Sequence, residues 1–249
     1  MAARRRLDAE LVRRGMATSR SEAASAVEAG LVTVAGAPAL KPSRLVAPDE
    51  PVRLAGPPRR FVSRGGEKLD AALVHFGVDV TGWRALDAGA STGGFTDCLL
   101  QRGAAHVVAV DVGHHQLHEK LRGDRRVAVR EGLNIRHADA ADLGAPFDLV
   151  VADLSFISLR TVAATLVGLL HQGGALVWLV KPQFEAGRAE ASKGRGVVRD
   201  PEIRARVRDE IHVHLADLGA DVHGWIDSPV PGPAGNVELL VHATIKDGP

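Results

Sequence analysis

Short apolar runs alternate with amphipathic stretches over most of this chain. The apolar runs predict a first strand that ends at Leu86. They predict further strands at His106–Val110, Val127–Val129, Phe147–Ala152, Ala175–Val180, Val222–Ile226 and Val237–Ile245. Apolar positions at helical spacing predict the helices Leu69–Phe76, Phe95–Arg102, Ser158–Leu170 and Pro201–Leu218. Strands that alternate with helices indicate an α/β fold with a mainly parallel sheet, in which ligands bind at the carboxyl ends of the strands.

The chain before residue 56 follows a different pattern. One amphipathic helix is predicted near its start, and Ser19 with Glu22 forms a capping box that predicts the start of a second. A short strand at Leu31–Val34 and a turn at Ala35–Pro38 follow, and Gly56–Arg60 is rich in proline and glycine. We therefore predict three parts: a small α+β domain at residues 1–58, a linker at 59–62 and a larger α/β domain at 63–249.

Composition narrows the class of protein. The chain has 249 residues, of which 45% are hydrophobic and 24% are charged, as in globular proteins. Its longest uninterrupted apolar run is Ala175–Val180, and about 20 apolar residues are needed to cross a bilayer. Arg4–Arg6 is followed by charged, amphipathic sequence rather than by the apolar stretch of a signal peptide. Cys98 is the single cysteine, which fits a reducing compartment. We expect a cytoplasmic protein without membrane insertion.

Charge is divided unequally between the two predicted domains. Residues 1–62 contain 11 Lys and Arg against 6 Asp and Glu, a net charge of +5, whereas residues 63–249 contain 20 against 24, a net charge of −4. The overall charge of +1 conceals this difference. A basic domain joined to an acidic one suggests that the first brings the second to a polyanion.

A glycine-rich turn follows the first strand of the larger domain. Asp87-x-Gly89-x-x-x-Gly93-Gly94 lies between that strand and a helix, which is where open α/β sheets bind nucleotide-like ligands. The dinucleotide fingerprint would need glycine at position 91, where the backbone approaches the pyrophosphate, and Ser91 stands there. This disfavours an NAD-dependent oxidoreductase. The spacing resembles motif I of the Rossmann-like class I methyltransferases, which bind S-adenosylmethionine.

Charged residues stand at or near the ends of several predicted strands. Asp111, Asp153 and Lys181 each follow an apolar run, at the sheet edge where ligands are expected. Four charged residues together resemble the Lys-Asp-Lys-Glu tetrad of the FtsJ-like RNA 2′-O-methyltransferases: Lys68, Asp153, Lys181 and Glu238. In that chemistry Lys181, with Lys68 as a neighbouring cation, would orient or deprotonate a ribose 2′-hydroxyl. The carboxylates of Asp153 and Glu238 would balance the positive charge. The rate would come largely from holding the two reactants together.

The first domain carries a second resemblance. Arg6-Leu7-Asp8, Ser19–Ala23 and Gly30–Val34 resemble, in this order, the S4 RNA-binding domain. The resemblance implies that Arg6, Arg20 and Lys41 face RNA phosphates. Such contacts give affinity without reading the sequence of the RNA.

Taken over essentially all of its length, the chain resembles the TlyA (haemolysin A) family of rRNA cytidine-2′-O-methyltransferases. The resemblance implies methylation of cytidine ribose in 16S and 23S rRNA, with ribosomal subunits as partners, S-adenosylmethionine as cofactor and no metal. It also implies cofactor contacts for seven residues: Asp87, Gly89, Ser91, Gly93, Gly94, Asp111 and Asn134. Asp111 would bind the ribose and Asn134 the adenine side. The family often has Trp or Tyr where Phe61 stands, so this chain departs from the family pattern at that position.

Two other functions and one possible metal site are open to test. The family's second name raises a membrane-active cytolysin, which the absence of a spanning segment disfavours and which liposome leakage would reveal. A non-catalytic ribosome-binding protein is disfavoured by the full tetrad, and calorimetry with S-adenosylmethionine would test it. His114 and His118 have the i, i+4 spacing of a zinc pair, but no third ligand is evident in the sequence, and a solvated helix explains them better.

Overall fold

The computed structural model describes residues 4–17, 20–55, 60–187, 190, 194, 196–232 and 234–246. Contacts within the chain divide it into two compact units, Met1–Arg60 and Phe61–Pro249. Phe61 is buried in the core of the second unit, and the Val62 N–H donates to Asp97 of that unit at 2.9 Å. The finer bounds predicted from the sequence, with a linker at 59–62, stay a prediction.

The first unit is a small α+β domain, as predicted. Its elements are β1 (Arg5–Arg6), α1 (Leu7–Arg13), α2 (Arg20–Glu28), β2 (Val32–Val34), β3 (Ala37–Pro38), β4 (Leu45–Val46) and β5 (Val52–Leu54). β1 pairs with β4, and the order β3-β2-β5 forms a second sheet. Leu7 and Leu11 of α1 pack with Val27 of α2 and with Val32 and Val34 of β2 in one apolar core. The predicted capping residue Ser19 lies outside the described residues.

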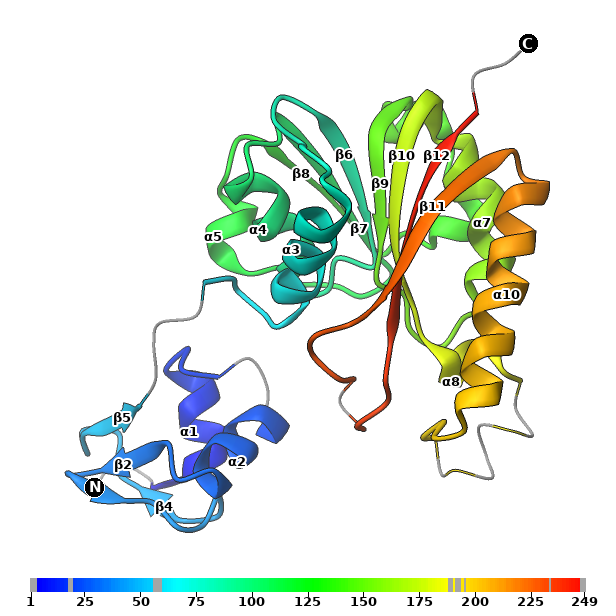
Figure 1. The fold of residues 1–249 in the computed structure, drawn as a ribbon. Coiled ribbons are helices and arrows are strands. Elements are labelled where there is room, and N and C mark those ends of the chain that lie inside the picture. The colour runs from blue at the N-terminus through cyan, green and yellow to red at the C-terminus, as the bar shows by residue number, and fades with distance from the viewer. Residues whose placement is uncertain are drawn as a thin grey trace. The chain divides into compact units, whose positions relative to one another are not determined.

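The second unit consists of helices on both sides of a sheet (Figure 1). Its elements are α3 (Gly65–Phe76), β6 (Arg84–Ala88), α4 (Gly94–Gln101), β7 (His106–Asp111), α5 (Glu119–Arg122), β8 (Val127–Glu131), the 3-10 turn η1 (Ile135–His137), α6 (Ala140–Leu143), β9 (Phe147–Ala152), α7 (Leu159–Gly168), β10 (Leu170–Val180), α8 (Pro182–Glu185), α10 (Pro201–Asp217), β11 (Ala220–Asp227) and β12 (Leu239–Ile245).

The seven strands have the order β11-β12-β10-β9-β6-β7-β8. The five strands from β10 to β8 are parallel, whereas β12 is antiparallel to both β10 and β11. The strand order reverses between β6 and β9, where open α/β sheets bind their ligands. This arrangement confirms the predicted Rossmann-like methyltransferase sheet with a small α+β domain before it.

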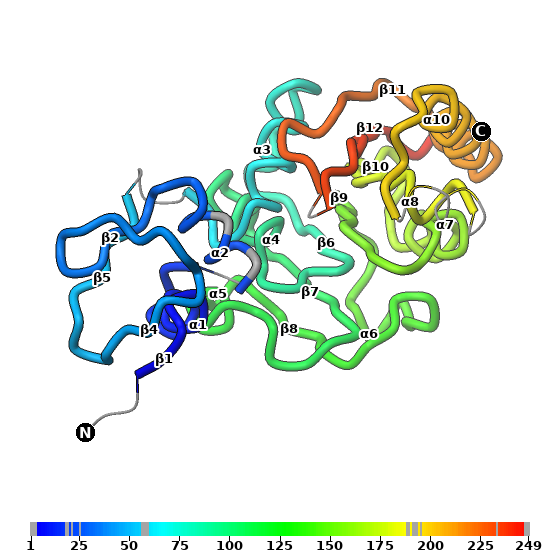
Figure 2. The backbone as a smooth tube through the Cα atoms, turned by 90° about the horizontal axis from the view of Figure 1, so that it is seen from below, coloured from blue at the N-terminus to red at the C-terminus, as the bar shows by residue number. Residues whose placement is uncertain are grey.

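Two apolar cores fill the space between the layers. Leu69 of α3 and Leu99 of α4 pack on one face of the sheet, and Leu166 of α7 and Ile211 of α10 pack on the other. Figure 2 shows α7, α8 and α10 together on one side of the second unit. Alternate strand residues therefore belong to different cores, which explains why the central strands read as continuous apolar runs. Among the described residues, no helix combines the length and apolarity that crossing a membrane requires.

Some predicted bounds are wrong, and the sequence shows why. α3 starts at Gly65 rather than Leu69, because two small residues allow close packing: a Cβ on Gly66 would lie 2.3 Å from the Phe61 ring. β10 starts at Leu170 rather than Ala175, and its pairing with β9 is irregular between these two residues, where Gly173 and Gly174 lie. The predicted turn at Ala35–Pro38 is a hairpin whose last two residues form β3.

Candidate active site

The four predicted catalytic residues stand on four elements that meet at one edge of the sheet. Asp153 follows β9, Lys181 follows β10 and Glu238 precedes β12. Lys68 lies on the first turn of α3. Because Val180 is opposite Leu239 in the antiparallel β10–β12 pair, the next register position places Lys181 opposite Glu238. The fold thus brings together residues that are far apart in the sequence.

Within this group the side chains form two ion pairs. Lys181 Nζ lies 2.6 Å from Asp153 Oδ1 and donates to Ser155 Oγ at 2.8 Å. Lys68 Nζ donates to Glu238 Oε2 at 2.5 Å. The side chains of Lys68 and Glu238 are 8% and 1% exposed, so each charge depends on its partner for compensation. The second carboxylate oxygen, Glu238 Oε1, is buried and has no hydrogen-bond partner among the described residues.

An exposed aromatic residue near the Lys181–Asp153 pair was not found from the sequence. Phe156 is 91% exposed and has φ +65°, a backbone conformation that is strained for a bulky residue. Its ring lies 5.3 Å from that of Phe184, and Lys181 Nζ lies 6.0 Å from the centre of the Phe184 ring. Its local sequence, Leu154-Ser155-Phe156-Ile157, carries no motif that marks a site residue. An exposed ring held beside reactive groups offers a surface on which a nucleobase can stack.

The glycine-rich turn between β6 and α4 has a tightly determined backbone. Gly89 has φ +86°, and a Cβ there would lie 2.6 Å from the Asp153 carbonyl oxygen, so this turn contacts the loop after β9. Ser91 also has positive φ, at 46°. Packing explains the other two glycines: Gly93 faces Leu121, and Gly94 faces Ser63. Cofactor contacts by these four residues remain a prediction.

Asp87 is a buried carboxyl at the end of β6. Its Oδ2 accepts hydrogen bonds from the Thr96 N–H at 2.9 Å and the Thr96 hydroxyl at 2.6 Å. Its Oδ1 is buried and has no partner among the described residues. Burial, and to a lesser degree the nearby Asp153 charge, raise the pKa of Asp87 to about 7. An unpartnered acceptor beside a glycine turn fits the ammonium group of a bound amino-acid moiety.

We expect the Asp87→Asn variant to lose a pH dependence of stability that the wild type has. The folded-state pKa of about 7 exceeds the unfolded value, so the folded state binds more protons between those two values and stability falls as pH rises through that window. The slope reaches at most about 1.4 kcal/mol per pH unit. Thermal melts from pH 4 to 8 measure it, with exposed Asp142→Asn as the control. Parallel curves for wild type and Asp87→Asn would contradict the assignment.

Asp111 and Asn134 lie at the carboxyl ends of the neighbouring strands β7 and β8, Asp111 as the last residue of β7 and Asn134 after β8. Asp111 ends β7, and its two carboxylate oxygens accept hydrogen bonds from the Ser91 N–H at 2.8 Å and the Gly113 N–H at 2.7 Å. It therefore connects its own strand end to the glycine-rich turn. Asn134 precedes η1, and its side-chain oxygen accepts from the Arg136 N–H at 3.0 Å. Both side chains are thus oriented by backbone groups, as residues that present polar atoms to a ligand need to be.

We expect Asp111→Ala to weaken S-adenosylmethionine binding by about 1.5–3 kcal/mol, because hydrogen bonds to a charged acceptor are lost. Calorimetric titration of the folded variant measures this. Glu131→Gln is a matched control, since Glu131 ends β8 directly opposite Asp111 in the parallel register. Unchanged affinity in Asp111→Ala, or an equal loss in the control, would remove Asp111 from the cofactor site.

In the first unit, Arg6 and Arg20 share one carboxylate. Arg6 donates to Asp8 through Nε at 3.1 Å and Nη2 at 2.8 Å, and Arg20 Nη2 donates to Asp8 Oδ2 at 3.2 Å. The Leu7 and Asp8 N–H groups donate to the Arg44 and Pro42 carbonyl oxygens, so the segment after Lys41 lies against the start of α1. The structure thus places Arg6 and Arg20 on one carboxylate at the start of α1, beside the segment that follows Lys41.

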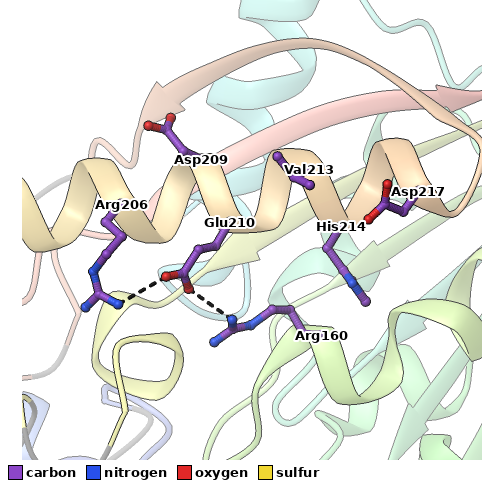
Figure 3. A pocket seen from close by; sticks show the side chains of 7 residues that line it. All are labelled: Arg160, Arg206, Asp209, Glu210, Val213, His214 and Asp217. Atoms are coloured by element: carbon purple, nitrogen blue, oxygen red, sulfur yellow. Dashed lines mark hydrogen bonds and ion pairs between the residues drawn. The ribbon is translucent and has the colours of Figure 1, made fainter.

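The remaining candidates from the sequence stay outside this arrangement. His118 caps the short helix α5, where its Nδ1 accepts from the Lys120 N–H, and Cys98 is buried. Across the described ranges, no three His, Cys, Asp or Glu side chains gather as a metal-binding group. A groove of about 660 Å³ beside α10 contains none of the predicted site residues (Figure 3). It is lined by Arg160, Arg206, Asp209, Glu210, Val213, His214 and Asp217.

Comparisons with known proteins agree with this geometry. The FtsJ-like methyltransferase family matches residues 61–244, and the S4 domain matches residues 5–52. The 16S/23S rRNA (cytidine-2′-O)-methyltransferase TlyA of Mycobacterium tuberculosis is 51% identical over 97% of this chain and 90% of its own length. Hemolysin A of Brachyspira hyodysenteriae is 38% identical over 96% of this chain and all of its own.

Among solved structures, a protein described as a hemolysin from Streptococcus thermophilus is 40% identical, with a TM-score of 0.81. It covers 100% of this chain, which covers 91% of that structure. A protein named as an rRNA methyltransferase and proteins named as hemolysins are therefore both similar to this chain over nearly all of its length. The chain belongs to the TlyA family of rRNA (cytidine-2′-O)-methyltransferases, which join an S4 domain to an FtsJ-like methyltransferase domain.

Proposed function

We propose that this protein transfers a methyl group from S-adenosylmethionine to the 2′-hydroxyl of cytidine ribose in 16S and 23S rRNA. The observation that carries the proposal is the pair of ion pairs, Lys181–Asp153 and Lys68–Glu238, at the sheet edge next to the glycine-rich turn. The name of the Mycobacterium tuberculosis relative, which this chain matches almost end to end, supports the same substrate.

The residues at the cofactor side fit S-adenosylmethionine in their chemistry. Asp87 offers a buried acceptor with no partner among the described residues, and Asp111 offers a carboxylate at the end of the next strand. These groups would hold the amino-acid and ribose ends, with Gly89 allowing close approach at the turn and Asn134 on the adenine side. When bound, S-adenosylmethionine would supply an electrophilic methyl group for transfer to the ribose oxygen.

The chain's own charged residues would act on the ribose hydroxyl. Lys181 Nζ is held by Asp153 and Ser155. As an ammonium it would donate to the 2′-oxygen and orient it, and as the neutral amine it would take up the hydroxyl proton. Lys68 adds a second cation, and Glu238 compensates it. Phe156 would stack on the base attached to that ribose. Holding the hydroxyl oxygen in line with the methyl carbon contributes much of the acceleration.

The direct test is to map 2′-O-methyl groups on rRNA from cells with and without this protein. We expect cytidine marks in both rRNAs only when the protein is present. Two further measurements separate the other functions. Calorimetric binding of S-adenosylmethionine contradicts a purely structural ribosome-binding role, and intact liposomes in the presence of the purified protein contradict a membrane-active one. Identical methylation maps would refute the proposed function.

A further inference from the structure

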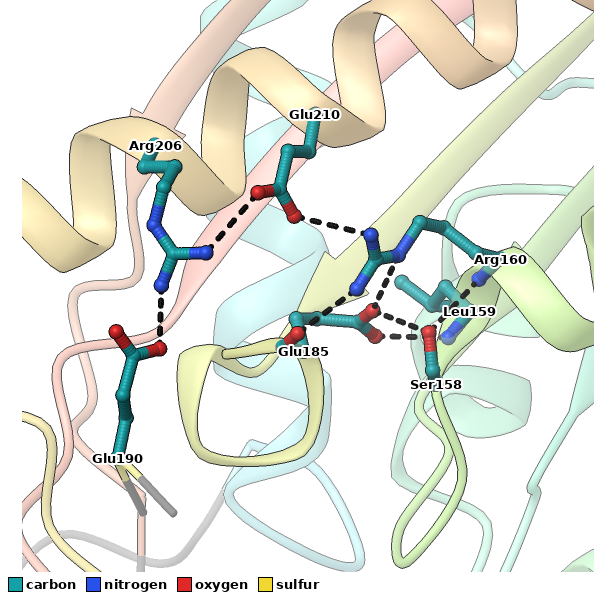
Figure 4. Close-up of polar contacts among 7 residues, drawn as sticks. All are labelled: Ser158, Leu159, Arg160, Glu185, Glu190, Arg206 and Glu210. Carbon is teal, nitrogen blue, oxygen red and sulfur yellow. Dashed lines mark hydrogen bonds and ion pairs between the residues drawn. The ribbon is translucent and has the colours of Figure 1, made fainter. Parts of the chain in front are cut away.

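Glu185 is a buried carboxylate four residues after Lys181, and no motif in the sequence marked it. Its side chain is 2% exposed at the end of α8. Oε1 accepts a hydrogen bond from the Leu159 N–H at 2.7 Å, and Oε2 accepts one from the Ser158 hydroxyl at 2.5 Å (Figure 4). Burial raises the pKa of this carboxyl. Its contacts reach the start of α7, more than 20 residues earlier in the chain.

Arg160 holds the same residue from a second direction. Its Nη2 donates to the Glu185 backbone carbonyl at 2.8 Å, and its Nε lies 3.7 Å from Oε2. Its Nη1 donates to Glu210 of α10 at 2.9 Å, and Arg206 binds the other oxygen of Glu210 at 3.1 Å. Both the backbone and the side chain of Glu185 are therefore fixed against α7, and that contact is supported by α10.

These contacts connect the two loops that carry one of the candidate catalytic pairs. The loop after β9, residues 153–158, begins with Asp153 and ends with Ser158. The segment after β10, residues 181–185, begins with Lys181 and ends with Glu185. The Lys181–Asp153 ion pair joins the starts of these segments, the Phe156–Phe184 ring contact joins their middles, and Glu185 joins their far ends.

Helix capping accounts for only one of the two Glu185 links, because the Leu159 N–H lies in the first turn of α7 and needs an acceptor. Ser158 already caps α7, because its Oγ accepts a hydrogen bond from the Arg160 N–H at 3.2 Å. A buried carboxylate is costly unless it is well paired, and an apolar residue at this position would avoid that cost. What Glu185 adds is a connection between the loop after β9 and the segment after β10, at the ends opposite to the Lys181–Asp153 ion pair.

We propose that Glu185 is a positioning residue for methyl transfer, which fixes the Lys181 segment against the Asp153 loop. This inference rests on the proposed function, because it concerns the rate of the same reaction. The physical reason is that displacement of a reacting group by about 1 Å can cost roughly 100-fold in rate, even when the substituted residue does not touch the substrate.

Three variants test the proposal. Glu185→Gln can keep both links, since its amide oxygen accepts from the Leu159 N–H and its amide N–H donates to the Ser158 hydroxyl oxygen. Glu185→Ala removes both links, and the shorter Glu185→Asp keeps the charge but cannot reach as far. Glu210→Gln is the matched control, because it changes the carboxylate on the outer side of Arg160 and leaves both loops untouched.

The measurement is single-turnover transfer of labelled methyl from S-adenosylmethionine to ribosomal subunits purified from cells that lack the protein. Rates are expressed per cofactor-binding site, counted by calorimetry, which removes the contribution of unfolded protein. We expect Glu185→Ala to be slower by about 100-fold, Glu185→Asp to be slowed less, and Glu185→Gln and Glu210→Gln to stay near the wild type. S-adenosylmethionine affinity should be unchanged in all four variants.

The possible outcomes are distinguishable. Wild-type rate per site in Glu185→Asp and Glu185→Ala, with only a lower melting temperature, would overturn the proposal by assigning Glu185 a structural role alone. Should Glu185→Ala not fold, the comparison of Glu185→Asp with Glu185→Gln decides in the same way. A wild-type protein that binds the cofactor but methylates neither subunit would refute the proposed function and not the positioning role in particular.

Discussion

Lys181→Ala should reduce methyl transfer to ribosomal RNA by roughly 10²–10⁴-fold, the range that a positioned proton-transfer group contributes. The affinities for S-adenosylmethionine and for RNA should stay nearly intact, because the interaction of Lys181 with the 2′-oxygen is made chiefly in the transition state. Single-turnover methyl transfer, together with thermal melts of each protein, measures these quantities. Lys246→Ala is the matched control, since it removes an exposed lysine that pairs with Asp221 at 3.4 Å.

Lys181→Arg separates two roles for this side chain. Guanidinium keeps its proton, and its planar fork differs in shape from the ammonium that lies between Asp153 and Ser155, so we expect this variant to be inactive as well. A purely structural partner of Asp153 would behave differently: alanine would lower the melting temperature, and arginine would restore it. Near-normal transfer by Lys181→Arg would mean that Lys181 serves only as a fixed positive charge.

The parts of the fold that periodicity predicts are those in which local pattern and tertiary packing agree. β9 has the predicted bounds because five of its six residues are apolar and buried, with the charged Asp148 as the exception. α10 starts at Pro201, as predicted, with Asp200 as a side-chain cap. The candidate site followed from the same logic, because residues after parallel strands must meet at one sheet edge.

What could not be predicted depends on contacts between distant residues. The pairing of Lys68 with Glu238 joins residues 170 positions apart, and no local pattern indicates which lysine takes which carboxylate. α8 has only four residues, which is too short for a helical periodicity, so the sequence showed a loop there. Glu185 read as one more loop charge for this reason. Its connection to α7 appears only once α8 is folded.

The Arg6→Ala/Arg20→Ala double variant should lose much of its RNA affinity while it binds S-adenosylmethionine normally. Both guanidinium groups are about half exposed, at 47% and 60%, and both bind the buried carboxylate of Asp8. These two arginines hold the pKa of Asp8 at about 2, so this carboxylate is charged at any physiological pH. The two cations are therefore held in place facing solvent, where RNA phosphates can reach them.

Salt dependence distinguishes phosphate contacts from other roles of these arginines. The slope of log K for RNA association against log salt concentration is negative. Its magnitude should decrease by about one for each arginine that has lost a phosphate contact. Arg53→Ala, which removes an exposed arginine from β5 of the same unit, is the control for loss of charge alone. If Arg53→Ala weakens binding as much as Arg20→Ala, or if the double variant keeps the wild-type slope, the arginines held by Asp8 do not contact the RNA backbone. Normal calorimetric binding of S-adenosylmethionine in the same preparations would show that the effect belongs to the first unit, as its separate core requires.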